Sequence, residues 1–219
     1  MQASSSAIYE FPIGPLPSGR HSLTRETVLA SQRGRLLDAM AQAVAEHGYG
    51  STTIAHVVSR AGVSRKTFYD HFSDKNDCFL AMYDTGIGFL LQRVSDTIEG
   101  QEDPHSRLVV GLQAVLSILS AEPAFCRAII VEVHAAGPEA LARRRAVVAV
   151  FADRYLDANR QARENGSKIA ELSVDKALAV VGGILDLIST RVEADRTETL
   201  PELADELTSF AVHNVLPRR

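Results

Sequence analysis

The strongest constraint on the fold is the meeting of two short amphipathic segments at Gly62. Apolar residues of the first segment recur at the spacing i, i+3, i+4, i+7, which is typical of one buried helix face. These residues are Ile54, Val57, Val58 and Ala61. Either Thr52 or Thr53 can cap the start of this helix. Gly62 must end it, because glycine accepts the left-handed conformation that turns the chain. The sequence therefore predicts a short helix followed by a tight turn.

The segment after the turn, residues 64–72, combines an apolar face with a cationic start. Ser64 is placed to cap a helix there, and Phe68 and Phe72, four residues apart, are expected in the core. Arg65 and Lys66 stand at the N-terminal end, where positive charge opposes the helix dipole. The presence of these two residues is explained better by binding of an external anion than by a contribution to helix stability. Two short helices joined by a glycine turn, the second one cationic, make the pattern of a helix-turn-helix.

The composition favours helices along the whole chain. The 219 residues include no Trp and only 6% are aromatic, whereas strands prefer β-branched and aromatic residues. We therefore expect an all-α protein of about nine helices, separated by Pro, Gly or polar capping clusters. The first helix starts at Arg25 and ends at His47 and Gly48, with Gly34 as a candidate break inside it. The other predicted ranges are 54–61, 64–72, 75 to the break at 100–104, 104–120, 123–135, 138–165, 174–194 and 200–216.

Positive charge is concentrated around the helix-turn-helix. From Arg20 to Lys75, eight Lys and Arg stand against five Asp and Glu, a local balance of +3. The remainder has fifteen against twenty-two, or -7, so that the whole chain carries -4. The surface of this block attracts anions more strongly than the rest of the chain does. The acidic total therefore does not argue against nucleic acid as a partner.

Several classes of protein receive no support from the sequence. No run of about eighteen apolar residues occurs, and the N-terminus lacks the order of a secretory signal, so we expect neither a membrane span nor export. Cys78 and Cys126 lie in separate segments without C-x-x-C spacing, which favours a reduced, cytoplasmic environment and inert thiols over redox sensors. No nucleophilic triad, phosphate loop or carboxylate pair stands out, so we expect no catalytic site, no metal and no cofactor.

Three stretches carry a family resemblance. They are YGSTTI at residues 49–54, AGVSRKTFYDHF at 61–72 and DK at 74–75. Together they closely resemble the TetR (tetracycline repressor) family of bacterial transcription regulators, over about Arg33 to Tyr83. The resemblance implies a helix-turn-helix DNA-binding domain at residues 24–74 and a regulatory domain for ligand binding and dimerisation at 75–219. Residues 1–23, rich in Ser, Pro and Gly, are expected to form a flexible N-terminal arm.

The helix-turn-helix pattern and the resemblance point to the same DNA contacts. The second helix of such a motif enters the major groove and its first residues meet base edges. The expected base contacts are Arg65, Lys66 and Thr67. The expected phosphate contacts, which fix register rather than sequence, are Thr53, Tyr69, His71 and Lys75. Arg33 and Arg35 are candidates for further contacts to the DNA backbone or minor groove, although arginine on a helix is more often solvated.

The resemblance also implies a small-molecule pocket in the regulatory domain. An apolar stripe is usually core, so the residues alone do not establish a cavity. The residues expected at the pocket are Phe79, Met82, Tyr83, Leu112, Leu116, Phe125, Ile129, Val133, His134, Val147, Phe151 and Tyr155. Glu132 and His134 are candidates to orient a polar group of the ligand. A fully apolar pocket would suit lipid-like or aromatic effectors better than sugars.

The last two predicted helices have the pattern of an interface between two copies. The stripe in Val174–Ala194 is broader than one packing face requires, and the pair Gly182 and Gly183 allows close helix approach. In the final helix the apolar residues follow 3-4-3-4 spacing, which suits a four-helix contact. The expected interface residues are Leu178, Val181, Gly182, Leu185, Leu203, Leu207 and Phe210. The resemblance implies a homodimer on a near-palindromic operator, and a bundle within one chain is the alternative.

The function expected from these features is a ligand-responsive transcriptional regulator. In the leading hypothesis it is a repressor, released from a double-stranded DNA operator by an unknown, apolar small-molecule effector. An activator of the same family is one alternative, and a helical adaptor that binds proteins without DNA is another. An enzyme is the third, and its candidate cluster is Glu132, His134 and Glu139. The family resemblance by itself does not identify the effector, the operator or the regulated genes.

Overall fold

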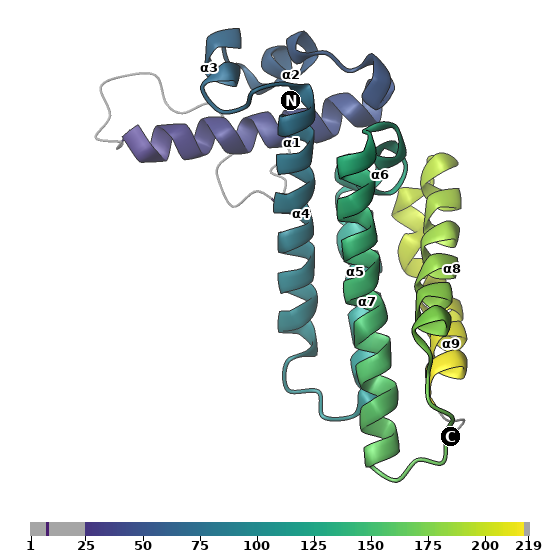
Figure 1. The fold of residues 1–219 in the computed structure, drawn as a ribbon. Coiled ribbons are helices and arrows are strands. Elements are labelled where there is room, and N and C mark those ends of the chain that lie inside the picture. The colour runs from purple at the N-terminus through teal and green to yellow at the C-terminus, as the bar shows by residue number, and fades with distance from the viewer. Residues whose placement is uncertain (1–7, 9–24, 217–219) are drawn as a thin grey trace.

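The computed structural model describes residue 8 and residues 25–216. Within these ranges the chain forms nine α-helices and two 3-10 helices and no strand, which confirms the predicted all-α fold (Figure 1). The α-helices are α1 (Arg25–Ser51), α2 (Ile54–Ala61), α3 (Arg65–Tyr69), α4 (Lys75–Ile98), α5 (Pro104–Ala121), α6 (Pro123–Ile130), α7 (Pro138–Glu164), α8 (Val174–Glu193) and α9 (Ala204–Val215). The 3-10 helices are η1 (Glu132–Ala135) and η2 (Thr197–Leu203).

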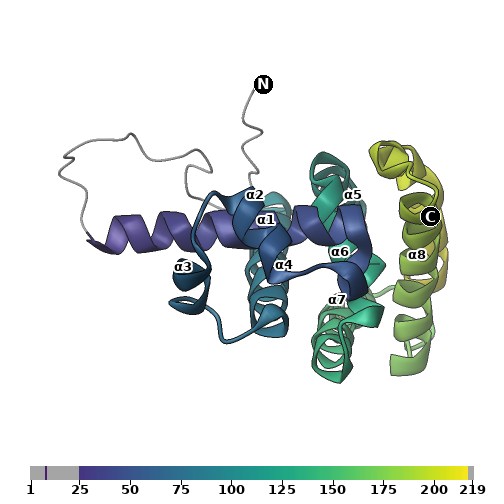
Figure 2. The ribbon, with the colours of Figure 1, turned by 90° about the horizontal axis from the view of Figure 1, so that it is seen from above.

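The helices are arranged as a small head on an upright bundle. In Figure 1, α4, α5, α7 and α8 stand upright, whereas α1 lies crosswise at the upper end of the bundle and stops short of α8. α2 and α3 lie on the outer side of α1, away from the bundle. α1 packs against α2, α4, α6 and η1, so it joins the head to the bundle. The view from above shows α8 at one edge of the bundle, on the opposite side from α3 (Figure 2).

Packing explains why α1 does not break at Gly34. Leu36, Met40 and Val44 recur on one face of α1 and are fully buried, and α1 packs against α4, whose Phe79 is also fully buried. A glycine inside a helix costs about 1 kcal/mol relative to Ala. Burial of each large apolar side chain contributes about 1.5 to 3 kcal/mol, so the buried face outweighs the local penalty.

One predicted helix end is confirmed and others are wrong. The predicted end at His47 and Gly48 coincides with a kink in α1, because Gly48 has the non-helical angles φ 74° and ψ 154°, and a short helical segment continues from there to Ser51. α3 is shorter than the predicted range 64–72, and the predicted range 123–135 divides into α6 and η1. The predicted last helix begins instead with η2, which contains Pro201. The α-helical hydrogen bonding of α9 starts at Ala204.

The structure describes little of the predicted N-terminal arm. The predicted arm at residues 1–23 lies outside the described residues except for Ile8, whose side chain is buried. The predicted boundary at residues 74 and 75 falls where Asp74 caps the start of α4, and it stays a prediction.

In the described ranges no single helix is long and apolar enough to cross a membrane. The pair α5 and α6 passes the same length and composition test only jointly, with a bend of 109° between the two helices.

Candidate nucleic-acid interface and internal cavity

The turn between α2 and α3 has the geometry that the sequence predicts. The Thr53 hydroxyl accepts a hydrogen bond from the backbone N–H of His56 at 3.3 Å, and the Thr53 N–H donates to Nδ1 of His56 at 3.4 Å. Gly62 ends α2 in the left-handed region, with φ 63° and ψ 40°. The Ser64 hydroxyl accepts from the Thr67 N–H at 3.0 Å and caps α3. Local hydrogen bonds therefore fix the start of each helix on either side of one glycine.

α3 turns its apolar side to the core and its charged side to solvent. Phe68 and Phe72 are buried, as predicted. Arg65 and Lys66 are exposed, and Tyr69 is 53% exposed although it is a large aromatic residue. Figures 1 and 2 show α3 on the outer surface of the head, on the side of α1 away from the upright helices. These three side chains are therefore accessible to a partner on that side.

The remaining expected DNA contacts differ in how accessible they are. Thr53 is exposed. Thr67 is half-buried, and its hydroxyl lies 2.9 Å from that of Ser64. The Nε2 atom of His71 is buried without a hydrogen-bond partner among the described residues. Burial of the ring and then the positive charge of Arg33 lower the pKa of His71.

Lys75 is held against the end of α1. Its Nζ atom donates a hydrogen bond to the Tyr49 carbonyl at 2.8 Å and lies 4.2 Å from the centre of the Tyr49 ring. Burial lowers the pKa of Lys75. The Tyr49 hydroxyl in turn donates to Oδ1 of Asn76 at 3.1 Å. If Lys75 contacts a DNA phosphate, its ammonium group therefore interacts with that phosphate and with the Tyr49 carbonyl at the same time.

Arg33 and Arg35 have structural partners in the head. The guanidinium of Arg33 lies 5.2 Å from the centre of the Phe72 ring, which is within cation–π range. Arg35 donates to the carbonyl of Ala61 at 3.0 Å, at the last residue of α2. Both contacts hold α1 against the helix-turn-helix, so these arginines serve the packing of the head.

The polar residues near η1 do not form the ligand contact or the cluster considered for an enzyme. Glu132 Oε2 accepts a hydrogen bond from the Tyr49 backbone N–H at 2.8 Å and so connects η1 to the kink of α1. His134 and Glu139 are exposed. We therefore correct the expectation that Glu132 and His134 orient a ligand.

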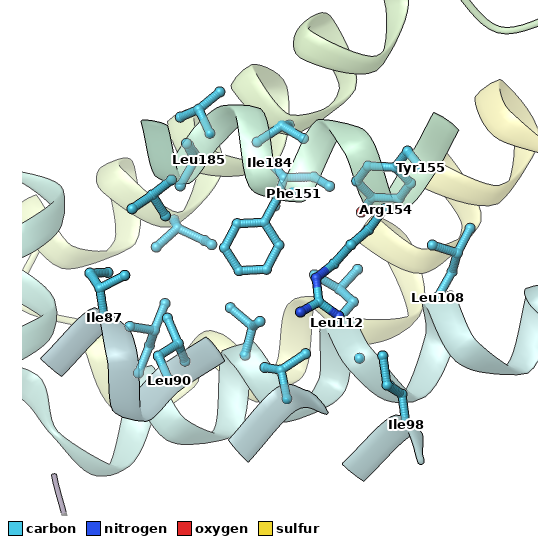
Figure 3. Close-up of a pocket in the computed structure, with 18 of the residues that line it drawn as sticks. Ile87, Leu90, Ile98, Leu108, Leu112, Phe151, Arg154, Tyr155, Ile184 and Leu185 are labelled. Carbon is cyan, nitrogen blue, oxygen red and sulfur yellow. The ribbon is translucent and has the colours of Figure 1, made fainter. Parts of the chain in front are cut away.

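A cavity of about 260 Å³ lies inside the bundle (Figure 3). Its walls come from α4, α5, α7 and α8, and the end of α6 closes one side. The lining is mainly aliphatic and aromatic, and Ile87, Leu90, Leu112, Phe151 and Ile184 are examples. Burial raises the pKa of Tyr155, another lining residue, to about 12, so its hydroxyl stays neutral. The volume is slightly below the range of about 300 to 1,000 Å³ that is usual for small-molecule sites.

Half of the residues expected at the pocket line this cavity. They are Tyr83, Leu112, Ile129, Val147, Phe151 and Tyr155. The other six residues do not line it. Five of them are buried in the core, namely Phe79, Met82, Leu116, Phe125 and Val133. The sixth, His134, is exposed. Arg154 also lines the cavity and was not among the expected residues. It follows Val147 and Phe151 and precedes Ala158 at 3-4 spacing on α7, which is the available signal for a shared face.

The two cysteines are buried free thiols. Cys78 and Cys126 are both 0% exposed. Burial raises the pKa of Cys126 to about 12 and raises that of Cys78 as well. Because the thiolate is the reactive form, both are expected to be inert in the folded protein.

The expected interface residues separate into exposed and buried sets. Leu178, Gly182 and Phe210 are exposed, and Leu185 is half-buried beside the cavity. The remaining expected residues are buried in the chain's own core, so their assignment to the interface was wrong. They are Val181, Leu203 and Leu207. Exposed Leu187 was not in the expected set, although it lies one turn beyond Gly183, and a Cβ at Gly183 would be 3.7 Å from the Phe210 ring.

Comparison with known proteins gives one family. Residues 36–82 match the model of the bacterial regulatory proteins of the tetR family. The HTH-type transcriptional activator FasR of Mycolicibacterium smegmatis is 26% identical over 141 residues, which are 64% of this chain and 64% of that protein. The fatty acid metabolism regulator protein of Bacillus subtilis is 23% identical over 88 residues, 40% of this chain and 45% of that protein. The chain thus spans less than two thirds of the length of these curated relatives.

Solved structures share the fold. The fatty acid degradation regulator FadR of Bacillus halodurans has a TM-score of 0.76 at 18% identity, over 85% of this chain and 97% of that chain. FadR of Bacillus subtilis, solved in complex with stearoyl-CoA, has a TM-score of 0.73 at 19% identity, over 83% of this chain and 98% of that chain. At such identity the likeness establishes the fold alone. Residues 36–82 therefore belong to the tetR family of bacterial regulatory proteins, and the described chain shares the fold of solved regulators.

Proposed function

We propose that the chain is a transcriptional regulator that binds a specific DNA site through α3. The observation that carries this proposal is the exposure of Arg65, Lys66 and Tyr69 on a helix whose position is fixed by buried Phe68. An arginine at the start of a recognition helix can pair bidentately with guanine in the major groove. The hydroxyl of Tyr69 and that of Thr53 are then suited to donate to phosphate on either side.

The proposed regulator acts as a homodimer through the outer face of α8 and α9. Leu187 is 46% and Phe210 44% exposed, and the small residues Gly182 and Gly183 lie beside them on α8. A second copy packed on this face would cover both large apolar side chains, and the glycines would let the helices approach closely. A two-fold dimer reads half-sites that are about 34 Å apart, which predicts a near-palindromic operator.

The proposed effector is a small molecule with a large apolar part, and its binding releases the operator. Its site is the cavity between α4, α5, α7 and α8, whose lining is mainly apolar. One relative of the same fold binds stearoyl-CoA, which supports an elongated apolar ligand. Because α4 begins in the head and lines the cavity, a ligand that alters its tilt changes the position of α3.

The first test is selection of bound fragments from source-genome DNA, followed by titration of the selected site at several salt concentrations. We expect a near-palindrome whose affinity falls steeply as salt increases. Arg65→Ala should weaken binding by about 1 to 3 kcal/mol, and Tyr69→Phe should weaken it by less. Arg160→Ala, which removes an exposed arginine from α7 in the bundle, is the matched control and should bind like the wild type. Absence of any enriched site would favour the adaptor.

Activation is the alternative mode of control, because the relative FasR is named an activator. Transcription from a promoter that carries the selected site separates the two modes. A repressor lowers transcript yield as protein is added, and the effector restores the yield. An activator raises the yield from the same template.

A further inference from the structure

One positively charged group inside the cavity lacks a counterpart. Arg154 extends from α7 among the apolar side chains of the lining (Figure 3). Its Nε atom is buried without a hydrogen-bond partner, and no ion pair of its guanidinium occurs among the described residues. The residue as a whole is half-buried. A charge that is partly removed from water and left unpaired is costly, so a residue of this kind marks a place where an anion would be stabilised.

Arg107, another arginine of the lining, is in a different situation. Arg107 donates from Nε to the Gln101 carbonyl at 2.7 Å and from a terminal nitrogen to the Gln161 side chain at 2.9 Å. Asp153, the neighbour of Arg154, is exposed. Asp157, the carboxylate of the cavity lining, is paired with Arg160. That carboxylate is therefore already used, and Arg154 is left to face the cavity.

The lining on one side of Arg154 is a long apolar stretch. Arg144 also lines the cavity, ten residues earlier on α7, which corresponds to about 15 Å along the helix. Val147 and Phe151 of α7 lie between the two arginines in sequence and also line the cavity. The wall is completed by aliphatic side chains of α4 and α8, which include Ile87, Leu90, Ile184 and Leu185. Such a wall accommodates an extended apolar body and offers it little to hydrogen-bond.

We infer that the cavity binds a free carboxylic acid with an aliphatic body, whose carboxylate pairs with Arg154 and whose body lies along the stretch towards Arg144. This inference rests on the proposed function, because it names the class of the effector. A guanidinium matches a carboxylate with two parallel hydrogen bonds, and a water-poor site strengthens them. One guanidinium balances one negative charge, whereas a doubly charged phosphate would remain partly unpaired. A thioester or ester would offer Arg154 only a neutral carbonyl.

The test is calorimetric titration of the full chain with straight-chain ligands that differ only in the head group. The probes are octanoic, dodecanoic and hexadecanoic acids, the matching alcohols and methyl esters, dodecyl phosphate and the coenzyme A thioester of dodecanoic acid. We expect an acid to bind tightest, with an affinity on the order of tenfold to a hundredfold above its alcohol, as charge-assisted hydrogen bonds provide. Stronger binding of the phosphate or of the thioester would overturn the inference, as would equal binding of acid and alcohol.

Variants of one residue type separate the head-group contact from the cavity itself. Arg154→Met keeps the length of the side chain and should lose the preference for acid over alcohol while it still binds the alcohol. Arg154→Lys should retain part of the preference. Arg145→Met, on the same helix but exposed and outside the cavity lining, should behave like the wild type. If Arg154→Met kept the full preference for the acid, the assignment of this residue would be wrong.

Binding of the selected DNA site is measured in parallel, so that two failures can be distinguished. A chain that binds DNA but none of the probes retains the proposed regulator and loses the carboxylic acid. A chain that binds acids through Arg154 but no DNA retains the acid site and loses the regulator. Thermal unfolding of Arg154→Met checks that the variant folds, and removal of an unpaired buried charge should not lower its stability.

Discussion

Glu132 accepts a hydrogen bond from the backbone N–H of Tyr49 at 2.8 Å, across 83 positions of sequence. The carbonyl of the same Tyr49 accepts from Lys75 at 2.8 Å. One residue at the end of α1 is therefore held by η1 on one side and by the start of α4 on the other. Ile129 and Ile130, at the end of α6 just before η1, line the cavity. These contacts form a continuous connection between the cavity and the head.

The first prediction concerns this connection. Glu132→Ala removes the acceptor and leaves the Tyr49 N–H unsatisfied, so the free energy of unfolding should fall by about 1 to 2 kcal/mol. The effector should also release DNA less completely, because a movement of α6 and η1 no longer pulls on the end of α1. Urea unfolding and DNA binding with and without effector measure the two effects.

Glu132→Gln is the control for that experiment, because its side-chain carbonyl can still accept from Tyr49. It should retain most of the stability and most of the response. If Glu132→Ala responded to effector as fully as Glu132→Gln does, the coupling would run through α4 alone.

The second prediction uses two glycines of α4 that are two residues apart. A Cβ added at Gly86 would lie 2.0 Å from the ring of Phe125, whereas a Cβ at Gly88 would meet nothing within 4 Å. Gly86→Ala should therefore overpack the contact between α4 and α6 and cost about 1 to 3 kcal/mol. Gly88→Ala should stabilise the protein by up to about 1 kcal/mol through helix propensity. Urea unfolding of both variants checks the difference.

A rescue variant tests the reason for that difference. Phe125→Leu replaces the ring with a smaller side chain. It should reduce the loss of stability caused by Gly86→Ala when the two changes are combined. Equal stability of Gly86→Ala and Gly88→Ala would contradict the close packing of α4 on α6.

The sequence predicted the helix-turn-helix well because its determinants are local. Thr53, Gly62 and Ser64 act through hydrogen bonds and dihedral angles within a few residues, and the apolar spacing identified Phe68 as core. Local rules do not identify which apolar residues line a cavity. Phe125 and Tyr83 look alike as apolar positions in a helix, yet only Tyr83 lines the cavity.

Long-range partners are the part that the sequence could not supply. Glu132 looks available for a ligand when only its sequence neighbours are known, because its actual partner Tyr49 lies 83 positions away. Arg154 was overlooked because α7 carries many arginines, and most arginines on helices are solvated. Its place in the cavity depends on how α7 packs against α4, α5 and α8, which no spacing within α7 determines.

The third prediction concerns the proposed dimer. Phe210→Glu places a charge on the outer face of α9, which a dimer would bury, so the protein should become monomeric at concentrations where the wild type is a dimer. Sedimentation equilibrium measures the change. Val150→Glu is the matched control, because Val150 is 39% exposed on α7, outside the proposed interface, and this variant should remain dimeric. A dimeric Phe210→Glu protein would place the interface elsewhere.

The fourth prediction is a pH dependence that originates at His71. Burial of its ring, and then the charge of Arg33, lower the pKa of His71, while Asp70 acts in the opposite direction. The folded state therefore binds a proton at His71 less readily than the unfolded chain, whose pKa is about 6.5. Stability should be full above that value and should decrease as the pH falls through it, until the lowered pKa of the folded state is passed.

His71→Gln removes this contribution, so its free energy of unfolding should fall less than that of the wild type between about pH 7.5 and pH 5.5. Arg33→Gln should also reduce the decrease, because it removes one of the two causes of the lowered pKa of His71. Urea unfolding at the two pH values gives the comparison, and the other histidines are common to all three proteins. Identical pH dependence in the wild type and His71→Gln would mean that the ring of His71 is no less easily protonated in the folded state than in the unfolded chain.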